Sequence, residues 1–182
     1  MQQQKRYEIL EGLPAYGPMY VPVSESGEQF FYEGFVVRFY KSDGKQWVAN
    51  FRPGWSQCNL VVDYADSNRV IVIAKGQGYI MNPDNEIPID TFGINIKDAI
   101  KTDDNKIVFV DDIYVWLVDD KGELWQSERI SWDGIKDLKL KDNILTGLSY
   151  DPTDSIIEWI PFSFDLETKE ITGGSYRRHP IQ

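Results

Sequence analysis

An asparagine that stands immediately before a short apolar run, or one residue further upstream, recurs at a nearly constant distance along the chain. Asn68, Asn105 and Asn143 each stand before residues such as Val, Ile and Leu, and they lie 37 and 38 residues apart. Asparagine suits this place because its short polar side chain tolerates the positive φ angle that tight hairpin turns require. The spacing therefore predicts a fold made of repeated β units, each joined by hairpins.

A second pattern agrees with this period. The Gly and the Trp of residues 44–47 (Gly-Lys-Gln-Trp) recur 78 positions later in residues 122–125 (Gly-Glu-Leu-Trp), which is about twice the unit. Trp55 and Trp132 follow these segments and are 77 residues apart. Two unrelated markers thus indicate the same repeat length.

The runs between the turns have the composition of strands. They are rich in Val, Ile, Tyr, Phe and Trp, whereas no helical period of 3.6 residues is sustained for three turns. We expect four repeats, at residues 14–53, 54–91, 92–131 and 132–176. The turns expected within them are Ser24–Gly27, Ser42–Gly44, Asp66–Asn68, Asn82–Asn85, Asp103–Asn105, Asp119–Gly122 and Glu167–Lys169.

In period and turn pattern, over about residues 14–176, the chain resembles β-propeller repeat proteins. The resemblance implies an all-β fold of about four blade-like repeats of antiparallel strands, forming a small or partial propeller. A β-sandwich or a barrel of meandering hairpins is the alternative. We expect a single domain over residues 7–176, with flexible tails at 1–6 and 177–182.

Alternate residues of a strand should face the neighbouring sheet. We expect one inward row from Val70, Val72 and Ala74, and another from Ile107 and Phe109. Because four repeats are few for ring closure, a homo-oligomer that covers the open sheet edges is a further expectation.

Charge and composition narrow the range of functions. The chain has 29 acidic and 19 basic residues and a formal net charge of -10, which argues against binding to nucleic acids or to an anionic membrane surface. It has no apolar run long enough for a signal peptide or a membrane span, so we expect a cytoplasmic protein. The single cysteine, Cys58, excludes an intramolecular disulfide.

The sequence contains no recognisable catalytic constellation. The one histidine, His179, lies near the end of the chain, and Cys58 stands in a β-rich stretch, which argues against a Cys or Ser hydrolase. The acidic turn at 119–123 lacks the alternating spacing of a calcium loop, and no phosphate-binding loop is present. We therefore expect no catalytic residue, no metal and no cofactor. Paired carboxylates that meet only in the fold stay open as an alternative.

Clustered tryptophan and arginine residues are the candidates for recognition, because both are enriched at interface hot spots. The same residues also suit a repeated core in which Arg stacks on Trp. The candidate interface residues are Arg38, Trp47, Arg52, Trp55, Trp125, Arg129 and Trp132.

These features predict a non-enzymatic protein-binding module whose partner is unidentified. The charge also fits an acidic antagonist of a basic protein, since complementary charge speeds encounter. The alternatives are a carbohydrate or small-ligand binding protein and a carboxylate-dependent hydrolase.

Overall fold

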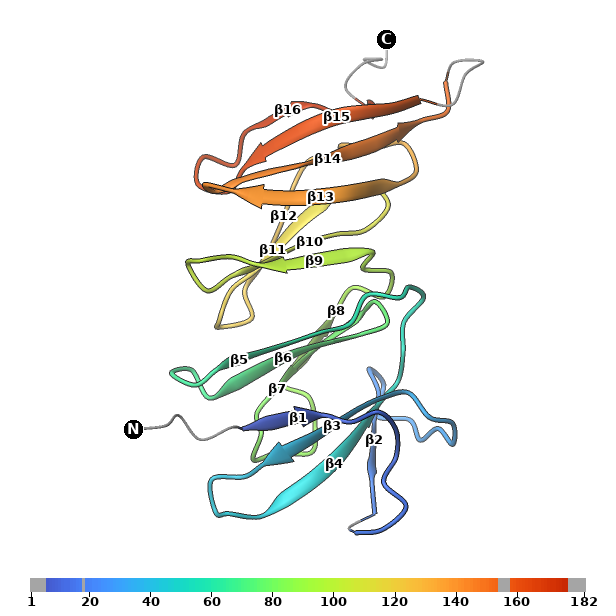
Figure 1. Ribbon diagram of the computed structural model, residues 1–182, viewed down its shortest axis with the longest axis vertical. Coiled ribbons are helices and arrows are strands. Elements are labelled where there is room, and N and C mark those ends of the chain that lie inside the picture. Colours follow the sequence, from blue (N-terminus) through green and yellow to red (C-terminus); the bar gives the residue numbers. More distant parts are fainter. Residues whose placement is uncertain (1–5, 18, 154–157, 177–182) are drawn as a thin grey trace. The chain divides into compact units, whose positions relative to one another are not determined.

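A computed structural model of the protein describes residues 6–17, 19–153 and 158–176 (Figure 1). These residues form sixteen β-strands in four sheets of four strands each, and they include no α-helix. The predicted all-β fold of about four blade-like repeats is therefore confirmed. The chain divides into two compact units, an N-terminal unit (Met1–Ile94) and a C-terminal unit (Asn95–Gln182). The single domain over 7–176 stays a prediction.

The N-terminal unit contains two sheets. The first has the order β1-β3-β4-β2, with strands Tyr7–Ile9, Phe35–Tyr40, Gln46–Phe51 and Val21–Val23. The second has the order β5-β6-β7-β8, with strands Leu60–Tyr64, Arg69–Ala74, Gln77–Met81 and Asp90–Phe92.

The C-terminal unit contains the other two sheets. The third comprises β9 to β12, at Asp98–Lys101, Ile107–Val110, Val115–Val118 and Leu124–Gln126. The fourth comprises β13 to β16, at Ile135–Lys141, Ile144–Asp151, Glu158–Asp165 and Ile171–Gly173. In both sheets, as in the second, consecutive strands are antiparallel neighbours.

The three marker asparagines occupy equivalent turns. Asn68, Asn105 and Asn143 lie in the first hairpin of the second, third and fourth sheets, and their φ angles are 52°, 60° and 63°. This left-handed conformation is the one that asparagine adopts more readily than most residues. The spacing that predicted the repeat is therefore the spacing of one structural turn.

The first sheet departs from the prediction in two ways. Its edge strand β1 begins at Tyr7, before the expected start of the first repeat at residue 14. The segment Ser24–Gly27 is a turn but does not close a hairpin, because β2 pairs in parallel with β4. Pro22 lies within β2, and a residue without an N–H is tolerated at such a sheet edge.

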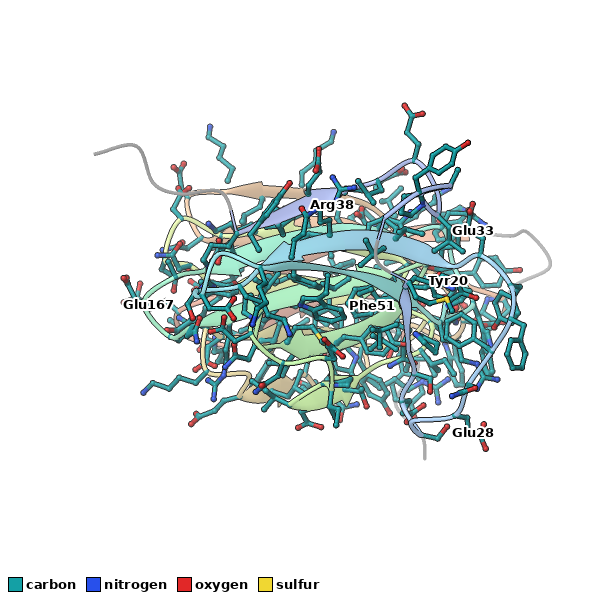
Figure 2. All side chains as sticks on the ribbon, turned by 90° about the horizontal axis from the view of Figure 1, so that it is seen from below. Tyr20, Glu28, Glu33, Arg38, Phe51 and Glu167 are labelled. Carbon is teal, nitrogen blue, oxygen red and sulfur yellow. The ribbon has the colours of Figure 1, made fainter. Side chains whose placement is uncertain are left out.

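Each unit has its own apolar core. In the N-terminal unit, Val70, Val72 and Ala74 pack with residues of the first sheet such as Phe39 and Phe51, which confirms the first inward row. Figure 2 shows Phe51 among these strands.

The second expected row, Ile107 and Phe109, is buried as expected, but it does not belong to the core cluster of the C-terminal unit. In the C-terminal unit the core contains Val108 and Val110, whereas Ile107 and Phe109 are equally buried on the opposite face. An uninterrupted apolar strand does not reveal which of its faces belongs to which core.

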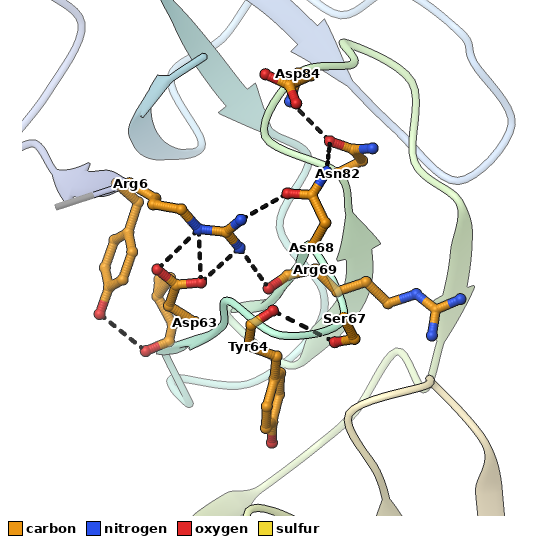
Figure 3. A network of polar contacts seen from close by, with 10 residues as sticks. Arg6, Asp63, Tyr64, Ser67, Asn68, Arg69, Asn82 and Asp84 are labelled. Atoms are coloured by element: carbon orange, nitrogen blue, oxygen red, sulfur yellow. Dashed lines mark hydrogen bonds and ion pairs between the residues drawn. The ribbon is translucent and has the colours of Figure 1, made fainter. Parts of the chain in front are cut away.

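Arg6, expected in the N-terminal tail, is anchored to the second sheet instead (Figure 3). Its guanidinium donates to the Asp63 carboxylate at 2.6 to 3.1 Å and to Asn68 Oδ1 at 2.6 Å. The Asn68 amide in turn donates to Asn82 Oδ1 at 3.3 Å. The first hairpin turn of the second sheet is thereby tied to the start of the chain. Residues 1–5 and 177–182, the rest of the expected tails, lie outside the described residues.

Candidate binding site around Trp55

Two of the predicted interface residues in the N-terminal unit, Trp47 and Arg38, make contacts within the fold itself. Trp47 is buried, stacks on Phe39 with ring centroids 5.0 Å apart, and donates from Nε1 to the Pro83 carbonyl at 2.8 Å. Arg38 forms an ion pair with Glu8 at 3.0 Å. Trp47 is therefore a core residue, and the Arg38 charge is already matched within the fold.

Trp125 belongs to the packing of the C-terminal unit. Its ring stacks on Phe164 at 5.4 Å with an interplanar angle of 13°, and the Lys169 ammonium lies 5.3 Å from the ring centroid. Trp125 thus repeats the role of Trp47, an aromatic ring stacked on a core phenylalanine.

Arg129 and Trp132 form a closed cluster with Tyr176. The Arg129 guanidinium lies 5.3 Å from the Trp132 centroid and 4.5 Å from the Tyr176 centroid. It also donates to the carbonyls of Ser131 and Trp132, at 3.0 and 2.9 Å. These bonds fix the guanidinium over the indole, so this pair is the stacked arrangement that the sequence left open as an alternative.

Trp55 differs from the other predicted tryptophans because 75% of it is exposed. Its backbone is nevertheless fixed: the Trp55 N–H donates to the Ile94 carbonyl and the Gly54 N–H donates to the Ala74 carbonyl, both at 2.9 Å. At Gly54 a Cβ atom would lie 2.3 Å from the Ile94 carbonyl oxygen, so only glycine allows this close approach. The loop backbone is therefore fixed, and it carries the indole outside the core.

A cavity of about 240 Å³ opens beside Trp55 in the N-terminal unit. It is lined by charged, polar and apolar side chains from four segments of the chain. The lining residues are Glu25, Ser26, Arg52, Pro53, Trp55, Gln77, Tyr79 and Ile94.

One of the charged side chains that line this cavity has an ion-pair partner and the other does not. Arg52 pairs with Glu28 at 3.5 Å, and Glu28 projects from a loop outside the strands (Figure 2). Glu25 is exposed and has no ion-pair or hydrogen-bond partner among the described residues. The site therefore presents one carboxylate that the fold does not neutralise.

Two buried polar side chains complete the cavity. Gln77 is 4% exposed, and its Nε2 donates to the carbonyls of Gly78 and Phe92, while its Oε1 accepts no hydrogen bond within the described residues. Tyr79 donates from its hydroxyl to the Arg52 carbonyl at 2.7 Å. Burial, and to a lesser extent the nearby Glu25 charge, raises the pKa of Tyr79 well above its usual value, so this hydroxyl stays a donor.

The structure thus separates the predicted set. Arg52 and Trp55 meet at the cavity, whereas Arg38, Trp47, Trp125, Arg129 and Trp132 have partners within their own units. Sequence reasoning missed Glu25, Gln77 and Tyr79. Gln77 alone carried a signal, as a polar residue at the start of the apolar strand β7.

Exposed apolar side chains are also unevenly distributed. In the described part of the chain, nine of the ten large ones are in the N-terminal unit, and Leu124 is the one in the C-terminal unit. The nine are Ile9, Tyr16, Met19, Phe31, Tyr32, Trp55, Ile87, Ile89 and Ile94.

Other kinds of site find no support in residues 6–17, 19–153 and 158–176. They contain no group of three or more His, Cys, Asp or Glu side chains that could hold a metal ion. Nor do they contain a helix of the length and apolarity needed to cross a membrane.

No family model matches the sequence, and no curated protein matches it. Among solved structures, the tricorn protease aligns with 95% of this chain and 18% of its own, at 16% identity and a TM-score of 0.43. The WD40 domain of Neurospora crassa Pan2 aligns with 94% of this chain and 72% of its own, at 13% identity and a TM-score of 0.26. The chain thus spans less than a fifth of the first of these structures.

Proposed function

We propose that the protein is a non-enzymatic protein-binding module and that Trp55 anchors the partner. The observation that carries this proposal is the exposed indole at the edge of a 240 Å³ cavity, on a loop whose backbone is hydrogen-bonded to the second sheet. Tryptophan buries more area than most residues and keeps a polar N–H, so truncation of such an anchor is costly in many complexes.

The contacts that hold the Trp55 loop reduce the conformational entropy that binding would cost. Gly54 admits a close backbone contact, and the Tyr79 hydroxyl holds the Arg52 carbonyl from below. A site that is already ordered loses less conformational entropy when a partner binds. The backbone that carries Trp55 is therefore already ordered before a partner binds.

The partner that best fits the charge is a basic protein. With a net charge of -10, the chain attracts positively charged surfaces, and the attraction weakens as salt increases. The role of an acidic antagonist of a basic protein follows from this charge and belongs to the proposal.

The test is affinity capture by the tagged full-length chain from lysate of its source cells, at low and moderate salt, with mass spectrometry. Trp55→Ala should lose a stoichiometric partner that the wild-type chain retains. Ile87→Ala is the matched control, because Ile87 is 78% exposed in the same unit but does not line this cavity. Equal capture by both variants would overturn Trp55 as the anchor.

A carbohydrate-binding function is the second candidate. The cavity combines an indole face with the carboxylate of Glu25, the amide of Gln77 and the guanidinium of Arg52, which are the groups that stack on sugar rings and bond their hydroxyls. A thermal-shift panel of mono- and oligosaccharides tests it, and a rise in melting temperature that Trp55→Ala abolishes would favour it. A paired-carboxylate hydrolase gains less support, because Glu25 is the one acid among the lining residues.

A further inference from the structure

We infer that the cavity beside Trp55 receives a basic side chain of the partner, an arginine or a lysine. This inference rests on the proposed function and names the chemical group that the site recognises. Three observations carry it: the charge of the cavity, the open face of the indole and the hydrogen-bond acceptors in the same lining.

The charge at the cavity favours a cation. Arg52 is the one basic residue in its lining, and Glu28 pairs with it at 3.5 Å. Glu25 has no partner within the described residues, so one negative charge remains. An incoming cation would meet an unmatched carboxylate, whereas an incoming anion would have to compete with Glu28 for Arg52.

The other tryptophans of this protein show what usually covers an indole here. Three of them carry a basic side chain: Lys169 lies over Trp125, Arg129 over Trp132, and Lys136 over Trp159 at 3.8 Å from the centroid.

Trp47 and Trp116 instead stack on the phenylalanines Phe39 and Phe109. Trp55 is the one tryptophan with neither a ring nor a cation against it in the described part of the chain. Its free face is a place for a cation supplied by another molecule.

The lining of the cavity supplies hydrogen-bond acceptors. An arginine head has five N–H donors and a lysine head has three, so burying either one requires oxygen acceptors. Gln77 is 4% exposed and its Oε1 accepts no bond within the described residues, and Glu25 and Ser26 also line the cavity. The Tyr79 hydroxyl, in contrast, already donates to the Arg52 carbonyl. The carboxylate of Glu25 and Oε1 of Gln77 are therefore open acceptors at the cavity, which suits a cationic donor.

The experiment is an NMR titration of the ¹⁵N-labelled full chain. The indole N–H signal of Trp55 is assigned by its loss in Trp55→Phe. The probes are N-acetyl-arginine amide, the neutral isostere N-acetyl-citrulline amide, and methyl α-glucoside. We expect the arginine amide to shift the Trp55 signal saturably, in the millimolar range, and the citrulline amide to bind about tenfold more weakly.

Two variants test whether the carboxylate of Glu25 is the charge that attracts the arginine amide. Glu25→Gln should weaken binding of the arginine amide about threefold and leave the citrulline amide unaffected. Glu11→Gln makes the same charge change at an exposed acid of the N-terminal unit that does not line the cavity, and it should have no effect. Both positions are exposed, and well-dispersed spectra of the variants will show that they remain folded.

The outcomes separate this inference from the proposed function. Equal binding of the arginine and citrulline amides, or no shift with the arginine amide, overturns the recognition of a cation. If Trp55→Ala still abolishes capture of the protein partner in that case, the binding module stands without it. Saturable binding of methyl α-glucoside with no captured partner would instead overturn both proposals in favour of the carbohydrate function.

Discussion

The loops that carry Trp55 and Trp132 occupy matching places in the two units, yet their tryptophans differ. Each loop leads from one sheet into the next, after β4 and after β12, and the two residues are 77 positions apart. Trp132 is enclosed by Arg129 and Tyr176, whereas 75% of Trp55 is exposed.

A repeated position can therefore keep the same residue type while the side chains that pack over it are absent. In the C-terminal unit the cation over the indole comes from the same chain. In the N-terminal unit the nearby arginine, Arg52, turns to Glu28 instead. The indole is covered at Trp132 and uncovered at Trp55, and the proposed function assigns the uncovered position to the partner.

The largest expected effect on stability comes from removing a buried tryptophan side chain, that of Trp47. Trp47→Ala removes a ring that is 4% exposed, its stacking on Phe39 and its hydrogen bond to Pro83. We expect a loss of about 3 to 5 kcal/mol in the free energy of unfolding, because the vacated volume cannot fully close. Urea unfolding followed by circular dichroism measures it. A loss below about 1 kcal/mol would contradict the core role given to Trp47.

A direct comparison of the two loops comes next. Trp132→Ala should lower the free energy of unfolding by about 2 kcal/mol, since it removes a half-buried ring and the cation–π contact of Arg129. Trp55→Ala should change it by less than about 0.5 kcal/mol, because an exposed side chain loses little packing. Thermal denaturation of both variants under one condition decides the matter. Equal losses would show that the loops do not differ as described.

The fold was largely predictable because turns carry strong local signals. Asn68, Asn105 and Asn143 reveal the repeat since few residues other than glycine adopt a positive φ angle readily. The first sheet was less predictable, because β2 joins β4 in parallel across a long connection without a hairpin signal.

The candidate site was predictable only in part. Arg52 and Trp55 stood out by residue type, but exposure depends on what the rest of the chain places over a side chain. Trp47 and Trp55 look alike in sequence, and only the fold buries one of them. Glu25 and Gln77 come from β-turn and strand segments distant in sequence from Trp55, so no local pattern could bring them to one cavity.

The support under the Trp55 loop gives a smaller effect. Tyr79→Phe removes the hydroxyl that donates to the Arg52 carbonyl at 2.7 Å and leaves that carbonyl without this donor. We expect a loss of about 1 kcal/mol in the free energy of unfolding and weaker partner binding, because the loop is held less firmly. Tyr114→Phe, in the C-terminal unit, is the control for the loss of a phenol hydroxyl and should leave partner capture unchanged. If Tyr79→Phe bound the partner as the wild type does, the preorganisation of this loop would not matter.

The smallest expected effect concerns the turn at Asn105 and its dependence on pH. Hydrogen bonds from Lys106 and Thr102 lower the pKa of Asp104 from its usual value of 3.8. The folded state therefore favours the ionised form, so the stabilisation is present above about pH 4 and is lost as the pH falls through the lower, folded-state pKa. Because both partners of the Lys106 ion pair are substantially exposed, we expect the loss to be only a few tenths of a kcal/mol. Unfolding curves between about pH 6 and pH 2 should show a slightly smaller acid destabilisation in Asp104→Asn than in the wild type, and a larger one would reverse the sign assigned to this carboxylate.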